Sequence, residues 1–179
     1  EEAAALTAAA EQTFGGLDAL VCSAGIAAPQ MLLTDLSTEG WRELMGTNLD
    51  GVFHVLRAAV PGFVRRQAGS IVTISSMWGI TGGSCEAAYS AAKAGVIGLT
   101  KALAQEEGPS GIRVNCLAPG VIDTPMNGDL SPEDVAALRE ETPLGRTGTP
   151  REAGEAIAYL LEAEFLTGQV LGLNGGMVV

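Results

Sequence analysis

The sequence predicts an α/β fold in which helices cover both faces of a doubly wound parallel sheet. Short, nearly continuous apolar runs alternate with longer stretches of helical periodicity, which is typical of βαβ units with right-handed crossovers. Glycine is abundant, with 24 residues, and aromatic residues make up only 4% of the chain, a composition that suits tight turns and close packing of helices on a sheet. We expect one domain over residues 1–179, because the 47% hydrophobic content is enough for a buried core.

The expected strands are short apolar runs bounded by turn residues. Each run is apolar at almost every position, which indicates a strand buried on both faces. The runs cover residues 18–23, 70–75, 112–118 and, more weakly, 169–173.

The expected helices lie between these runs. Residues 2–12 are rich in alanine. Apolar residues recur three and four positions apart over residues 38–67 and 84–107. The region 120–148 is irregular and contains a short helix at 131–141 that Ser131 caps, with Pro132 in its first turn. A long excursion of this kind in a compact domain is usually a lid or a binding loop.

The charge balance excludes several classes of partner. The chain has 10 Lys and Arg against 21 Asp and Glu, a formal net charge of −11, and such an acidic surface repels nucleic-acid phosphates and anionic lipid. No apolar run approaches the length of a membrane span. We therefore expect no nucleic-acid partner, no membrane partner and a cytoplasmic location.

The cysteines and the single histidine predict no metal site. Cys22, Cys85 and Cys116 are far apart and form no C-x-x-C motif, which favours reduced core thiols over a disulfide framework. His54 has no ligand at metal-binding spacing, so we expect it to pack or to contact another subunit.

Tyr89 and Lys93 are the first candidates for chemistry. They lie four residues apart in a predicted helix, and residues at this spacing share one face. An ammonium beside a phenol favours its anion, so we expect Lys93 to lower the pKa of Tyr89 from about 10. A tyrosine tuned in this way exchanges a proton near neutral pH. The competing interpretation is an exposed contact between an aromatic ring and an aliphatic stem.

Two polar residues strengthen this interpretation. In an open parallel sheet, ligands bind outside the carboxyl ends of the strands, and Ser76 directly follows the run 70–75. Its hydroxyl could hold a carbonyl oxygen next to Tyr89, or it could serve only as a helix cap or turn. Asn48 lies in the middle of a predicted helix, where it indicates a backbone distortion or a bound water, or else a solvated face.

Together these motifs resemble the short-chain dehydrogenase/reductase family along almost the whole chain. Ser23-Ala24-Gly25 follows the first strand, and Asn48, Ser76, Tyr89 and Lys93 have the family's spacing. The match continues through Pro119-Gly120-Val121-Ile122-Asp123-Thr124 to Asn174-Gly175-Gly176. The resemblance implies a Rossmann-type fold and an NAD(P)-dependent oxidoreductase acting on a carbonyl or secondary alcohol.

The resemblance also implies roles for individual residues. Tyr89 would be the acid/base, Ser76 would orient the carbonyl, Lys93 would tune Tyr89 and bind the nicotinamide ribose, and Asn48 would hold a relay water. NADP(H) is favoured over NAD(H) as cofactor. Its expected binding residues are Ser23, Ala24, Gly25, Tyr89, Lys93, Pro119, Gly120, Ile122 and Thr124.

Two departures from the family pattern stand out. Cys22 and Ser23 replace two asparagines, so the usual bracing of the turn after the first strand is in doubt. The family's first three strands and its glycine-rich turn do not occur in this sequence. We expect them to precede Glu1 in the complete molecule, so that these residues form the C-terminal two-thirds of a Rossmann-type domain.

Within the family the chain is most similar to the 3-oxoacyl-acyl-carrier-protein reductases of fatty acid biosynthesis. The similarity includes Gly111-Ile112-Arg113-Val114-Asn115 and Pro143-Leu144-Gly145-Arg146. Such an enzyme needs a basic patch near its cleft to dock an acidic carrier. Arg65 and Arg66 could supply it, although Glu106 and Glu107 weaken the case.

An alternative resemblance is to the bacterial reductase of 5-aminopentanone attached to elongation factor P. It rests on Met77-Trp78-Gly79 and on the segment around Glu86, whose carboxylate could pair with a substrate amine or favour the helix start. Trp78, Glu86 and Met126 are the candidate substrate residues, with core packing equally open for Trp78 and Met126. A non-catalytic dimerisation relative is the third alternative. In each case we expect a dimer or tetramer built on the helices at 38–67 and 84–107.

Overall fold

The computed structural model describes residues 1–27, 29–128 and 130–179. It contains a four-stranded parallel sheet in the order β1-β2-β3-β4. The strands are β1 (Ala19–Cys22), β2 (Gly69–Ile74), β3 (Ile112–Pro119) and β4 (Val170–Leu173). All four expected strands are therefore confirmed.

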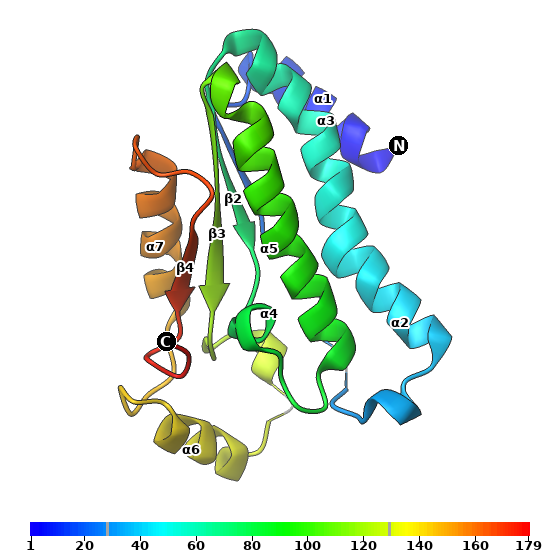
Figure 1. Cartoon of the computed structure of the whole chain (residues 1–179), viewed down its shortest axis with the longest axis vertical. Coiled ribbons are helices and arrows are strands. Elements are labelled where there is room, and N and C mark those ends of the chain that lie inside the picture. Colours follow the sequence, from blue (N-terminus) through cyan, green and yellow to red (C-terminus); the bar gives the residue numbers. More distant parts are fainter. Residues whose placement is uncertain (28, 129) are drawn as a thin grey trace.

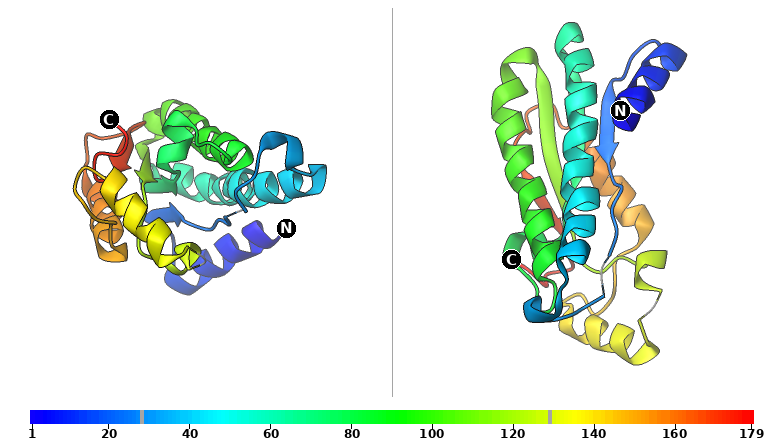
Figure 2. Two further views of the ribbon diagram at one scale, coloured as in Figure 1. Left: turned by 90° about the horizontal axis from the view of Figure 1, so that it is seen from below. Right: turned by 90° about the vertical axis from the view of Figure 1, so that its right-hand side faces the viewer.

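Helices cover both faces of this sheet (Figures 1 and 2). Ile71 of β2 belongs to a core that also contains residues of the two long helices in front of the sheet, whereas its neighbour Val72 packs with Leu160 behind it. Adjacent strand residues point to opposite faces, so strand β2 is buried on both sides and the doubly wound α/β prediction is confirmed. The helices are α1 (Glu2–Phe14), α2 (Thr38–Met45), α3 (Gly51–Arg66), α4 (Met77–Thr81), α5 (Ala87–Glu107), α6 (Pro132–Glu141) and α7 (Pro150–Glu162).

The predicted helix at 38–67 contains a distortion where Asn48 suggested one. Helices α2 and α3 are joined by a π turn, η2 (Gly46–Asp50), in which the Gly51 N–H donates to the Gly46 carbonyl. Asn48 lies inside this turn and is fully buried. The prediction of a local backbone distortion is confirmed, and the alternative of a solvated face is wrong.

Two other helix predictions need comment. Helix α5 begins at Ala87, so the expected start at residue 84 is wrong. The reason is a turn in which Cys85 adopts a left-handed φ of 60° and the Glu86 N–H donates to the Gly83 carbonyl. Helix α6 has the expected Ser131 cap, which accepts from the Asp134 N–H.

The strand ends that matter for function all lie at one edge of the sheet. The parallel register aligns Cys22 with Thr73 and Ile74 with Leu117, so the chain leaves β1, β2 and β3 on the same side. In the described part of the chain, none of the helices combines the length and apolar content that crossing a membrane needs.

Candidate active site

Ser76 connects strand β2 to the short helix α4 and reaches Tyr89. It is the N-cap of α4, and its Oγ accepts from the Trp78 N–H at 3.2 Å. The same side chain lies close enough to Tyr89 to lower the pKa of its phenol. Ser76 is therefore both a helix cap and a neighbour of the phenol, so the two interpretations of this residue do not exclude each other.

Lys93 lies beside Tyr89 on the face of α5 that packs on the sheet. Its Nζ is 5.6 Å from the centroid of the Tyr89 ring and donates to the Ile74 carbonyl at 3.0 Å. The Lys93 side chain is only 5% exposed. The interpretation of the pair as an exposed helix contact is therefore wrong.

Burial, rather than Lys93, dominates the ionisation of Tyr89. Desolvation raises the pKa of the Tyr89 phenol, the negative charge of Glu86 raises it further, and the Ser76 side chain partly opposes both. Burial also lowers the pKa of Lys93. The expectation that Lys93 lowers the pKa of the Tyr89 phenol below its ordinary value is thus wrong. A raised pKa keeps the phenol protonated near neutral pH, which is the form that can donate a proton to a carbonyl oxygen.

Asn48 braces the turn that follows β1. Its Oδ1 accepts from the Ile26 N–H at 2.8 Å, and its Nδ2 donates to the Ile26 carbonyl at 2.9 Å. This pairing explains how the turn is held without the two asparagines that Cys22 and Ser23 replace. The relay water proposed for Asn48 stays a prediction.

Gly25 brings the same turn against the catalytic candidates. A Cβ built on Gly25 would lie 3.0 Å from Asn48 Oδ1 and 3.5 Å from Lys93 Nζ. Only glycine leaves this space open, so the turn forms a cradle of the kind a nicotinamide ribose requires beside Lys93. Ser23 and Ala24, which precede Gly25, are exposed at the end of β1.

The remaining cofactor candidates follow β3. Gly120 lies against Asn174, whose Cα would be 2.9 Å from an added Cβ. Pro119 ends the strand, and Ile122 forms an isolated bridge with Gly148. Thr124 Oγ1 donates to the Ile122 carbonyl at 3.4 Å. These residues lie at the same edge as Ser76, so the residues present fit a dinucleotide across the carboxyl ends of the strands.

A shallow pocket adjoins Tyr89, and Glu86 is its one acidic residue. Glu86 Oε1 accepts from Gln30 Nε2 at 3.3 Å, and burial raises the pKa of this carboxyl. Glu86 occupies the N-cap position of α5 but makes no side-chain capping bond. The pocket is lined by Pro29, Met31, Leu33, Leu36, Leu44, Cys85, Glu86, Ala87, Ala88 and Tyr89.

The other two substrate candidates lie outside this lining. Trp78 is half-buried, and its ring packs over Gly83. Met126 is 51% exposed in the turn η4 (Pro125–Asn127). Of the three candidate substrate residues, the described structure brings only Glu86 into the pocket with Tyr89.

A family model described as enoyl-(acyl carrier protein) reductase matches residues 1–178. The chain belongs to the short-chain dehydrogenase/reductase family. It is accordingly an NAD(P)-dependent oxidoreductase, and the resemblance seen in its motifs is confirmed.

Several relatives of this reductase chain are known. It is 40% identical to the 3-oxoacyl-[acyl-carrier-protein] reductase FabG of Vibrio cholerae, covering 99% of the chain and 73% of the relative. It is 42% identical to FabG of Thermotoga maritima over 94% of the chain and 69% of the relative. The uncharacterized oxidoreductase YmfI of Bacillus subtilis is 40% identical over 89% of the chain and 66% of the relative.

A solved structure shares the fold of the reductase chain. An ElxO variant with NADPH bound superposes with a TM-score of 0.91 at 30% identity, covering 98% of this chain and 73% of the ElxO chain. The Rossmann-type fold is therefore shown by a structural neighbour as well as by the sheet itself.

The basic doublet of this reductase does not lie near its cleft. Arg65 and Arg66 end α3, immediately before β2 begins at Gly69, and Arg65 pairs with Glu11 of α1 at 3.5 Å. Glu106 and Glu107 end α5, shortly before β3 begins. Both segments lie at the amino end of the sheet, so the expectation that Arg65 and Arg66 form a patch beside the chain's own cleft is wrong.

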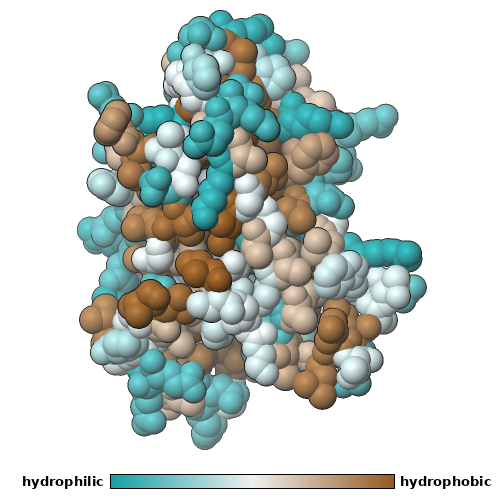
Figure 3. Space-filling model, viewed as in Figure 1, coloured by the Kyte–Doolittle hydropathy of each residue, from teal (hydrophilic) through white to brown (hydrophobic). Residues whose placement is uncertain are grey.

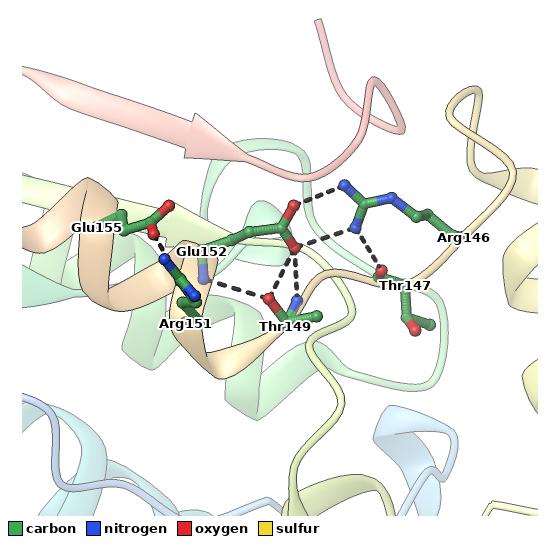
Figure 4. A network of polar contacts seen from close by, with 6 residues as sticks. All are labelled: Arg146, Thr147, Thr149, Arg151, Glu152 and Glu155. Atoms are coloured by element: carbon green, nitrogen blue, oxygen red, sulfur yellow. Dashed lines mark hydrogen bonds and ion pairs between the residues drawn. The ribbon is translucent and has the colours of Figure 1, made fainter.

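An ion-pair network fastens the loop before α7 (Figure 4). The two terminal nitrogens of Arg146, Nη1 and Nη2, donate to Glu152, and Glu152 also accepts from the Thr149 N–H at 2.8 Å. These bonds lower the pKa of Glu152 from 4.5 to about 2. The network was not predicted from the sequence, although Thr149 and Glu152 have the spacing of a capping box.

Buried polar residues of β3 also escaped prediction. Asn115 is fully buried, donates to the Leu166 carbonyl at 2.8 Å and accepts from the Gln169 N–H at 3.0 Å. Arg113 donates to carbonyls at the end of α7, including that of Ala163 at 2.8 Å. These bonds secure α7 and β4 to the sheet. The residue patterns that indicate catalytic or binding residues in the sequence do not predict them.

Proposed function

We propose that this protein is an NAD(P)H-dependent carbonyl reductase that converts a 3-oxoacyl thioester to its 3-hydroxyacyl form. The observation that carries the proposal is the meeting of Ser76 and Lys93 at Tyr89, on the carboxyl edge of the sheet. The names of the FabG relatives support the substrate class. An intact set of these three residues speaks against a non-catalytic dimerisation relative.

The chemistry assigns one step to each side chain. The cofactor, when bound, supplies the hydride, because no side chain can do so. Ser76 holds the carbonyl oxygen, and Tyr89 donates its phenolic proton to that oxygen as the carbonyl carbon is reduced. Lys93 stabilises the tyrosinate left behind through its ammonium charge. Asn48 holds a water that returns a proton to the site.

Cofactor binding is assigned to the segments that follow β1 and β3. Lys93 and Tyr89 would hold the nicotinamide ribose. The other residues are Ser23, Ala24, Gly25, Pro119, Gly120, Ile122 and Thr124. NADP(H) is preferred over NAD(H), and the NADPH in the ElxO structure supports this choice.

The position of Glu86 supports a second candidate substrate, an amino-ketone such as the 5-aminopentanone group of elongation factor P. A half-buried carboxylate in a pocket that is otherwise mostly apolar suits an ammonium better than a neutral acyl chain. Helix α6 near the carboxyl edge adds acidic side chains, among them Glu133 and Asp134 in its first turn. These charges would repel an acidic carrier protein.

A substrate panel distinguishes the two candidates. Reduction of a 3-oxoacyl thioester and of an amino-ketone would be followed by the loss of nicotinamide absorbance, in the parent and in Glu86→Gln. If the amino-ketone is the substrate, Glu86→Gln raises its KM about tenfold or more, because the ammonium loses its partner. If the thioester is the substrate, Glu86→Gln leaves its reduction within a few-fold. Glu106→Gln, at the far end of α5, is the matched control, and a parent that reduces neither class contradicts the proposal.

The active protein is proposed to be a homo-oligomer, a dimer or tetramer, in the cytoplasm. Phe53 on α3 is 41% exposed although Val52 and Leu56 beside it are buried. On α5 an exposed strip of small residues, Ala91, Ala94 and Gly98, would let a second copy approach closely. Figure 3 shows apolar residues gathered on the face seen there. The three free cysteines suit a reducing compartment.

A further inference from the structure

The residues at the end of β2 hold Lys93 at two points. Ser75 Oγ donates to the Lys93 backbone carbonyl at 2.8 Å. Lys93 Nζ donates in return to the carbonyl of Ile74 at 3.0 Å. Since Ser76, the next residue, lies close to the Tyr89 phenol, three consecutive residues at the end of β2 face one turn of α5.

Ser75 itself is fixed from the sheet side. Its N–H donates to the Leu117 carbonyl of β3 at 2.8 Å, and the residue is 3% exposed. It does not line the described pocket beside Tyr89. The hydroxyl of Ser75 therefore acts on α5 and not on a substrate.

Gly79 of α4 closes over this junction. A Cβ added to Gly79 would contact Ser75 Oγ and would lie 2.8 Å from the backbone carbon of Lys93. Helix α4 can approach so closely only because the residue is glycine. The junction between Ser75 and Lys93 is consequently dry and tightly packed, a setting in which a hydrogen bond fixes geometry strongly.

We propose that Ser75 is a positioning residue, which pins α5 to the end of β2 at Lys93 and thereby sets the geometry of Ser76, Tyr89 and Lys93. This inference rests on the proposed carbonyl reduction. Tyr89 and Lys93 reach the site from one helix, whereas Ser76 reaches it from the strand. The relative positions of Ser76, Tyr89 and Lys93 therefore depend on how α5 is held against the end of β2. The hydrogen bond from the Ser75 hydroxyl to the Lys93 carbonyl holds the helix there.

The test compares Ser75→Ala with Ser70→Ala in the full-length protein. Ser70 is also buried on β2, and its Oγ has no hydrogen-bond partner among the residues that the structure describes. Both substitutions remove a buried serine hydroxyl, one within β2 and the other at the residue that directly follows it. We expect Ser75→Ala to lower kcat about tenfold or more with little change in substrate KM, because small misplacements of reacting groups are costly, and Ser70→Ala to match the parent.

A spectroscopic readout separates this inference from the proposed function. Tyr89 and Tyr159 are the tyrosines of residues 1–179, and the Tyr89 phenol is isolated as the difference between the absorbance titrations of each variant with and without Tyr89→Phe. Among the described residues, the charged groups next to Tyr89 are Lys93 of α5 and Glu86 at the N-cap of that helix, and neither is changed. We expect Ser75→Ala to move the Tyr89 titration to higher pH, because a displaced phenol loses the contact with the Ser76 side chain that lowers its pKa. This shift is measurable even if no carbonyl is reduced.

Ser75→Cys covers the case in which the alanine variant does not fold. Cysteine retains a weak donor of similar size, so we expect its kcat and its Tyr89 titration to lie between those of the parent and a fully displaced site. The proposal is overturned if the Ser75 variant that folds has a kcat within twofold of the parent and an unchanged Tyr89 titration. Equal losses in Ser70→Ala also overturn it, since they would reflect general destabilisation of β2.

Discussion

At the scale of the residue, Tyr89 and Lys93 show what spacing can and cannot reveal. Their separation by four positions predicted a shared helix face, and the structure confirms it. The direction of the phenol pKa was wrong, because the spacing gives the neighbour but not the burial that outweighs it. The contact of Ser75 with Lys93 could not be predicted from the sequence, because the bond joins residues 18 positions apart. The only indication was that Ser75 lies next to Ser76.

Lys93→Met tests the double role of the ammonium. The apolar stem fits the buried site, but the charge and the donor to Ile74 are lost. We expect weaker nucleotide binding and a reaction slowed by about tenfold or more, measured by nucleotide fluorescence titration and by steady-state rates. Lys101→Met, which removes an exposed lysine from the same helix, is the control. An unchanged nucleotide Kd with an unchanged pH profile in Lys93→Met would remove both roles from this residue.

At the scale of the element, strands were easier to predict than helix boundaries. The runs that form β1, β2 and β3 are rich in apolar residues and stand out in the sequence, whereas the run of β4 is weaker. Helix α5 starts late because Cys85 takes a left-handed conformation, which no pattern at that residue signals. Helix α7 is absent from the expected elements, although Ile157, Leu160 and Leu161 lie at helical spacing and Thr149 and Glu152 form a capping box at its start.

Glu152→Gln tests the network at the start of α7. The folded pKa of Glu152 is about 2, below its ordinary value of 4.5, so its stabilisation is complete above pH 4.5 and is lost as the pH falls toward 2. We expect Glu152→Gln to lower the Tm near neutral pH and to converge with the parent as the pH falls. Glu155→Gln, which breaks a more exposed pair with Arg151, should change the Tm much less. A gap between Glu152→Gln and the parent that stays constant with pH would contradict this account.

At the scale of the whole molecule, the parallel sheet brings distant segments to one edge. The turns after β1, β2 and β3 meet there because parallel strands share a direction. This much follows from the order of strands and helices in the sequence. The position of Arg65 and Arg66 follows from the same geometry, since α3 runs back to the amino edge before β2 begins.

The exposed surface of α3 and α5 predicts self-association. We expect light scattering at micromolar concentration to give a mass of two or four subunits. Ala94→Arg on α5 should shift this mass toward the monomer, because a charged side chain would be buried unpaired between close helices. Ala136→Arg on the exposed side of α6 should leave the mass unchanged. A monomeric parent protein would contradict the prediction.

The central claim is that Tyr89 donates the proton in carbonyl reduction, and Tyr89→Phe tests it most directly. The measurement is nucleotide oxidation with the best substrate of the panel, with Tyr159→Phe, at an exposed position of α7, as control. We predict that Tyr89→Phe lowers the rate about a hundredfold or more while the circular dichroism spectrum stays unchanged, and that Tyr159→Phe matches the parent. A Tyr89→Phe rate within a few-fold of the parent would contradict the account.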